Sequence, residues 1–137
     1  MIAVSGQTGE MVPLHCTAHG KALLADCEAA DLKTIFGSAQ LRNYTKQTTR
    51  TLAQLADTCA QIRARGYATD DGEFQQGVRC SAAPIRAHDG MVIGSIEISA
   101  PLLRFPKERY RTIGLQVKEA ADQISAGLSS PTQKRAV

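Results

Sequence analysis

Residues 78–100 read VRCSAAPIRAHDGMVIGSIEISA. Every second residue from Val78 to Ala82 is small or apolar, and the same alternation returns from Val92 to Ile98. This period of two is typical of strands with one face against a core. Asp89-Gly90 lies between the two runs and is a pair that favours a tight turn. The stretch therefore predicts an antiparallel β-hairpin.

Amphipathic helices are predicted on both sides of this hairpin. Residues 51–65 carry apolar residues at spacings of three, four and three, and Gly66 suits a helix end. Pro101 ends the second strand, and Pro106 suits the first turn of a long helix. The apolar positions of these two helices are Leu52, Leu55, Cys59 and Ile62, then Tyr110, Ile113, Val117, Ala120, Ala121, Ile124 and Leu128.

The N-terminal half is predicted to be mostly helix and loop. Residues 1–4 resemble the tail of a strand followed by a turn, and residues 28–36 form a short helix with Leu32, Ile35 and Phe36 on one face. Residues 38–50 are polar and are expected to be loop. This order indicates an α+β domain with an antiparallel sheet over residues 1–128, followed by a flexible tail at 129–137.

Composition narrows the class of protein. The chain has 137 residues, 43% of them hydrophobic, with a net charge of +3 and no tryptophan. No apolar run is long enough to span a membrane and no signal pattern begins the chain, so a cytoplasmic location is expected. The basic residues are scattered, which predicts no nucleic-acid surface in this chain. The four cysteines lack metal-site or disulfide spacing, and no metal or cofactor is expected.

The segment PLHCTAHGKALLA, residues 13–25, places small and polar residues at the start of a predicted helix. The first N–H groups of a helix have no partner within it and attract anions such as carboxylates. Small residues at Ala18 and Gly20 permit close approach to the backbone. Gly20 also suits plain helix packing and Thr17 a plain cap, and these residues alone favour that simpler interpretation.

Six short motifs occur in order along the chain: PLHCTAHGK at 13–21, RGY at 65–67, DDGE at 70–73, GVRC at 77–80, AAPI at 82–85 and IEIS at 96–99. Together they resemble the effector-binding domain of the IclR family of bacterial transcription regulators, from about Val12 to Leu128. The resemblance implies a GAF-like sheet flanked by helices. It also implies a pocket for a small metabolite, often an organic or aromatic acid, whose binding shifts the equilibrium between DNA-competent and incompetent oligomers, either dimers or tetramers.

The resemblance assigns the pocket to the helix start and the strands that carry the cysteine and serine motifs. Carried over position by position, the effector-binding residues are Val12, Ala18, His19, Asp70, Val78, Cys80, Glu97 and Ser99.

Two departures from the family pattern affect these expectations. The winged helix-turn-helix and the first strands of the sheet are not found in this chain, so DNA binding is expected only through a region outside it. The missing strands would leave a sheet edge unpaired. Many relatives have a small serine where this chain has Glu97. An acidic side chain there would repel a carboxylate ligand, or would pair with a cationic or hydroxylated one.

Several residues allow two interpretations. Asp70 is either a turn residue that binds nearby backbone or a wall of the pocket. Cys80 is either a plain buried thiol or a ligand-facing one. Lys21 is expected to extend its ammonium group to solvent rather than meet a ligand carboxylate. His15 and His19 are four residues apart, but no acidic residue accompanies them as in zinc motifs, so metal binding is ranked low.

Two other functions compete with ligand sensing. A cysteine enzyme would use Cys80 or Cys16 with His15 or His19 as base, but no third orienting residue or oxyanion hole is evident. The chain is therefore not expected to be an enzyme. The other alternative is a truncated relative that senses nothing and acts only as an oligomerisation partner.

Overall fold

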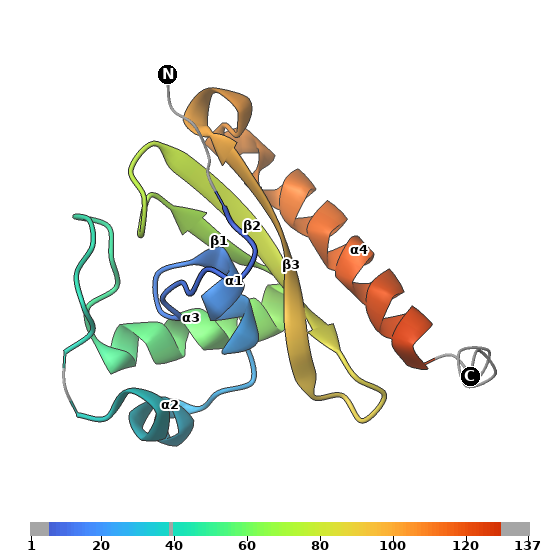
Figure 1. Cartoon of the computed structure of the whole chain (residues 1–137), viewed down its shortest axis with the longest axis horizontal. Helices are drawn as coiled ribbons and strands as arrows, with labels where there is room; N and C mark the ends of the chain where they lie inside the picture. Colours follow the sequence, from blue (N-terminus) through green and yellow to red (C-terminus); the bar gives the residue numbers. More distant parts are fainter. Residues whose placement is uncertain (1–5, 39, 130–137) are drawn as a thin grey trace.

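A computed structural model describes residues 6–38 and 40–129 of the chain (Figure 1). Within them the elements follow the predicted order, helices first, then strands, then a long helix. They are α1 (Ala18–Leu23), α2 (Ala29–Phe36), α3 (Leu52–Arg65), β1 (Ala68–Asp71), β2 (Val78–Arg86), β3 (Val92–Pro101), the short 3-10 helices η1 (Leu102–Arg104) and η2 (Lys107–Arg109), and α4 (Tyr110–Ser129).

The strands form an antiparallel sheet in the order β1-β2-β3, which confirms the α+β class and the predicted hairpin. The turn between β2 and β3 contains Gly90 at a φ of 86°, a left-handed conformation that glycine adopts without strain. In register, Cys80 lies opposite Ser99 and Ala82 lies opposite Glu97. These four side chains therefore share one face of the sheet.

Helices cover both faces of the sheet (Figure 1). The long helix α4 packs against one face, where Ala83 of β2 joins a core that includes Phe105, Ile113 and Val117. The short helix α1 packs against the other face, where alanines of α1 meet Val78, Cys80 and Ala82 of β2 and Ile62 of α3. Both faces of β2 are consequently buried, including Ser81, which donates to the carbonyl of Ala68.

The predicted ends of α3 agree with the structure, whereas Pro106, predicted in the first turn of the long helix, caps η2, and α4 begins only at Tyr110. Thr51 caps α3 by accepting the N–H of Gln54, and Gly66 ends it in the left-handed conformation at a φ of 88°. Glu28 and Asp31 form a capping box at the start of α2. Both helices contribute to a third apolar cluster that includes Leu24, Leu32, Leu41, Leu55 and Cys59.

Several predicted positions differ from the structure. Ile35 of α2 and Ile124 and Leu128 of α4 are exposed, because only part of each helix face meets a neighbour. Asp70 and Asp71 end β1 rather than forming the turn, which begins at Gly72. Ser129, expected in the tail, is the last residue of α4. The predictions for residues 1–4 and 130–137 lie outside the described residues. None of the described helices is long and apolar enough to cross a membrane.

Candidate functional site

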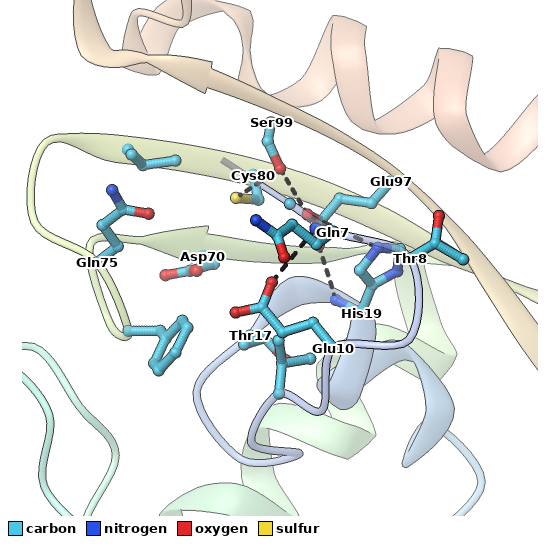
Figure 2. Close-up of a pocket in the computed structure, with 14 residues that line it drawn as sticks. Gln7, Thr8, Glu10, Thr17, His19, Asp70, Gln75, Cys80, Glu97 and Ser99 are labelled. Carbon is cyan, nitrogen blue, oxygen red and sulfur yellow. Dashed lines mark hydrogen bonds and ion pairs between the residues drawn. The ribbon is translucent and has the colours of Figure 1, made fainter. Parts of the chain in front are cut away.

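A cavity of about 430 Å³ lies between the start of α1, the face of the sheet that α1 packs against and the loop after β1 (Figure 2). The cavity lies on the face of the sheet opposite α4. Its lining comes from four parts of the chain, namely residues 6–12, α1 with its cap, the β1–β2 region and β3. The described lining residues are Gly6, Gln7, Thr8, Glu10, Val12, Thr17, His19, Asp70, Phe74, Gln75, Val78, Cys80, Glu97 and Ser99.

The structure brings together most of the residues that the resemblance assigned to a pocket. The predicted residues that line the cavity are Val12, His19, Asp70, Val78, Cys80, Glu97 and Ser99. Ala18 is placed differently. Its side chain is fully buried in the core between α1 and β2 and is not part of the lining, because the first turn of α1 directs that position towards the sheet.

Half of the lining was not predicted from the sequence, including Thr17, which was expected only to cap the helix. Gly6, Gln7, Thr8 and Glu10 reach the cavity from the segment before α1, and no periodic pattern marks them. Phe74 and Gln75 line it from the loop after β1. Phe74 did offer a signal, since a phenylalanine in a polar loop next to Asp-Asp-Gly-Glu needs an apolar surface to cover it.

The start of α1 is already bonded from within the chain. Thr17 caps the helix by accepting the N–H of Gly20 at 3.0 Å. The N–H of His19 donates to the Glu97 carboxylate, at 3.0 Å from Oε2. A Cβ on Gly20 would overlap the backbone of Leu14, so this glycine serves close packing of the chain and not approach of a ligand. The simpler interpretation of Gly20 is therefore confirmed, and Glu97 fills the anion-binding position predicted for this helix start.

Glu97 is the centre of a polar network on β3. Its Oε1 accepts the hydroxyl of Ser99 at 2.5 Å and lies 3.8 Å from Nε2 of His19. The Ser99 hydroxyl also lies 3.2 Å from the sulfur of Cys80 on the neighbouring strand. The other ring nitrogen of His19 pairs with the hydroxyl of Ser95 at 2.8 Å. Figure 2 shows His19, Cys80, Glu97 and Ser99 close together at one wall of the cavity.

Asp70 combines the two roles that the sequence left open. Its Oδ1 accepts the N–H of Glu73 at 2.7 Å, which is a turn contact, while the side chain also lines the cavity. The residue is only 5% exposed. Burial raises the pKa of the Asp70 carboxyl to about 7, and the neighbouring charge of Glu73 adds to this rise. The Asp70 carboxyl therefore keeps its proton to a much higher pH than an ordinary aspartate does.

Lys21 departs from its predicted solvent-exposed position. It is buried, and its Nζ lies 2.8 Å and 2.6 Å from the two carboxylate oxygens of Glu73. The carbonyl of Glu73 in turn accepts the hydroxyl of Thr48 at 2.6 Å. These contacts tie α1 and the segment around Thr48 to the loop that carries Phe74 into the cavity. Lys21 supports the cavity wall and does not face a ligand.

The cysteines and histidines do not form a catalytic arrangement. Burial, with the nearby charge of Glu97, raises the pKa of the Cys80 thiol to about 12. Burial, with the charge of Asp70, raises the pKa of Cys16 to the same value. Both are therefore thiols and poor nucleophiles at neutral pH. The two histidines have different partners, because His15 pairs with the carbonyl of Arg42 and His19 pairs with the hydroxyl of Ser95. The described residues contain no cluster arranged to hold a metal ion.

The lining is rich in acidic groups. Among the described lining residues, Glu10, Asp70 and Glu97 are carboxylic acids and His19 is the one basic side chain. An apolar patch accompanies them, formed by Val12, Phe74 and Val78. The cavity can therefore hold a small molecule that offers carbon surface on one side and polar groups on the other.

The chain is similar in sequence to bacterial transcription regulators. A family model for the bacterial transcriptional regulator IclR C-terminal domain matches residues 1–126. The transcriptional regulator BhcR of Paracoccus denitrificans is 39% identical over 121 residues, which cover 88% of this chain and 43% of BhcR. The regulator KdgR of Escherichia coli is 36% identical over 118 residues, covering 86% of this chain and 45% of KdgR.

The fold is shared as well. The crystal structure of the Agobacterium tumefaciens repressor BlcR matches with a TM-score of 0.85 at 30% identity, over 91% of this chain and 50% of that one. The chain thus spans about half the length of the curated relatives it matches. Those relatives are transcription regulators and not enzymes. This chain belongs to the IclR family of bacterial transcription regulators, and it corresponds to their C-terminal domain.

Proposed function

We propose that the domain senses a small metabolite, which binds in the cavity beside α1 and changes the activity of the regulator to which the domain belongs. The supporting observation is that residues assigned to a pocket from short, separate motifs, such as His19, Asp70 and Cys80, line a single cavity. His19 comes from α1, which is distant in sequence from strands β1 and β2, where Asp70 and Cys80 lie.

The cavity is connected to elements through which binding can act. Residues of α1 and β3 line the cavity, so a bound molecule would contact both elements. The ion pair of Lys21 and Glu73 also joins α1 to the loop that contains Phe74. A ligand that fixes these elements would change the surfaces that they present to other subunits. Ligand binding would thereby shift the equilibrium between DNA-competent and incompetent dimers or tetramers, with DNA contacted by a winged helix-turn-helix outside this chain. This role is exercised in the cytoplasm.

Both the family resemblance and the lining of the cavity bear on the chemical class of the effector. The family resemblance favours an organic or aromatic acid. The apolar patch of Val12, Phe74 and Val78 suits the carbon skeleton of such a compound. The carboxylates of Glu10 and Glu97 disfavour an acidic group placed near them.

Thermal unfolding in the presence of a broad metabolite panel tests ligand binding. At least one compound should raise the melting temperature, because binding to the folded state alone stabilises it. Asp70→Ala and Cys80→Leu should reduce that rise, while Asp57→Ala and Cys27→Leu, which lie outside the cavity lining, should leave it unchanged. A folded protein that responds to no compound would contradict the proposal.

The sheet edge supports a second candidate function, that of an oligomerisation partner. Within the described residues β3 pairs only with β2, and its exposed residues include Ile93 and Ile98. An apolar strand with an unpaired side is suited to pairing with another chain. Size-exclusion chromatography with and without a full-length relative tests this role. A chain that stays monomeric and never co-elutes with the relative would contradict it.

A further inference from the structure

The cavity contains its own carboxylate at the position where a carboxylate ligand would find hydrogen-bond donors. Glu97 accepts the backbone N–H of His19 and the hydroxyl of Ser99. Its side chain is 13% exposed, so most of it is withdrawn from solvent. A carboxylate ligand that approached the same wall would have to displace Glu97 or share its donors.

The donors next to Glu97 are therefore already in use, and the other acidic side chains of the lining, Glu10 and Asp70, add further carboxyl groups to the cavity. Asp70 is buried, and the N–H that it accepts comes from Glu73, outside the lining. Glu10 accepts the N–H of Gln7 at 3.3 Å and also lines the cavity. Carboxylates that are partly withdrawn from solvent, as Asp70 and Glu97 are, bind donors and cations strongly and oppose a further negative charge nearby.

His19 compensates for little of this negative charge. Its ring lies 3.8 Å from Glu97 and is also paired with Ser95. Any positive charge on the ring is therefore already next to the Glu97 carboxylate. A second anion beside Glu97 would therefore meet a carboxylate, and the nearest basic side chain would already be engaged.

We propose that Glu97 acts as an internal substitute for a ligand carboxylate, so that the cavity selects small molecules bearing ammonium or several hydroxyl groups over carboxylic acids. This inference rests on the effector-binding function proposed above and specifies its ligand class. Glu97 is then the residue that determines specificity. A serine at this position would leave the His19 N–H free for an anion.

Two series of probes that share a skeleton test this selectivity. Gluconate, sorbitol and 1-amino-1-deoxysorbitol differ only in the group at one end of a six-carbon chain. Benzoate, benzyl alcohol and benzylamine share an aromatic ring and differ in the same way in the group attached to it. Dissociation constants for each are measured by isothermal titration calorimetry at neutral pH on the wild-type protein, on Glu97→Ser and on Glu97→Gln. The exposed Glu108 of η2 provides a control, Glu108→Ser, with the same change in charge away from the cavity.

In at least one series the wild-type protein should bind the amine or the alcohol at least tenfold more tightly than the carboxylate. Comparing the amine with the alcohol separates attraction to a positive charge from hydrogen bonding alone. Glu97→Ser and Glu97→Gln should improve carboxylate binding at least tenfold and weaken amine binding, and Glu108→Ser should do neither. Glu97→Gln retains the size of the side chain and serves if the serine variant does not fold.

Carboxylates that bind the wild-type protein as tightly as their amine and alcohol partners would overturn the inference and leave the effector-binding function intact. Unchanged selectivity in both Glu97 variants would overturn it in the same way. Failure of every probe, and of the wider metabolite panel, to bind any of the proteins would count against both the inference and the proposed function.

Discussion

The two faces of β3 meet very different surroundings. Ile96 and Ala100 point towards α4 and pack against its apolar core. On the opposite face Glu97 and Ser99 line a cavity and bind each other. A strand in a small domain normally places polar residues towards solvent, but here they lie against a helix start and a buried carboxyl group. The α4 face therefore provides stability, and the cavity face is where function is expected.

The largest expected effect tests the α4 face. Phe105 is fully buried among the residues that contact α4, and its ring packs edge-on against Tyr110 at 5.4 Å. Phe105→Ala should lower the free energy of unfolding by about 4 kcal/mol through lost burial and the cavity it leaves. Chemical denaturation measures this loss.

The same variant sharpens the comparison between the faces. The ratio of amine to carboxylate affinity should be unchanged in Phe105→Ala, because Phe105 does not line the cavity. A changed ratio would show that the two faces are not independent.

A somewhat smaller effect is expected from the ion pair behind the cavity. Lys21→Met should lower the free energy of unfolding by about 3 kcal/mol, because it leaves the half-enclosed Glu73 carboxylate without its cation. The double variant Lys21→Met/Glu73→Gln should recover a large part of the loss, since no unpaired charge remains. Denaturant titrations of the single and double variants provide the measurement. A double variant less stable than Lys21→Met would rule out this explanation.

The third effect depends on pH and arises from Asp70. Burial raises its pKa from 3.8 to about 7, so between these values the folded protein retains a proton that the unfolded chain releases. The contribution of this carboxyl to stability is full in acid and is lost as the pH rises through 7. Asp70→Asn avoids the loss, and its stability relative to wild type should rise by about 2 kcal/mol from about pH 5 to about pH 8.

The control for this prediction is the exposed Asp57 of α3. Asp57→Asn should show no such trend when its unfolding is followed over the same pH range. A flat difference between Asp70→Asn and wild type would mean that the Asp70 carboxyl is ionised throughout.

Local patterns predicted most of the fold. The spacing of Leu55, Cys59 and Ile62 gave the correct helix, and Asp89-Gly90 gave the hairpin, because both depend on neighbours within a few residues. The exposure of Ile35 and Ile124 could not be predicted in the same way. Periodicity identifies an apolar stripe, but only the placement of distant elements decides how much of the stripe is covered.

The site was predicted less completely for a related reason. Motif resemblance located Asp70 and Cys80, but the partner of Lys21 lies 52 residues away and nothing in the local sequence links it to Glu73. The segment that contains Gln7 and Glu10 lines the cavity because the folded chain brings it next to α1 and β3, and no local pattern predicts that position. The bond from the His19 N–H to Glu97 spans 78 residues, so the local sequence could not show that a carboxylate of the chain itself occupies the helix start.

That bond is the central claim, and the amide proton resonance of His19 tests it without any ligand. In ¹⁵N-correlated spectra the wild-type resonance should lie downfield and exchange slowly with solvent, as expected for an N–H donating to a carboxylate. It should move upfield in Glu97→Gln and stay in place in Glu108→Gln. A His19 resonance that is the same in wild type and Glu97→Gln would contradict the claim that Glu97 occupies the start of α1.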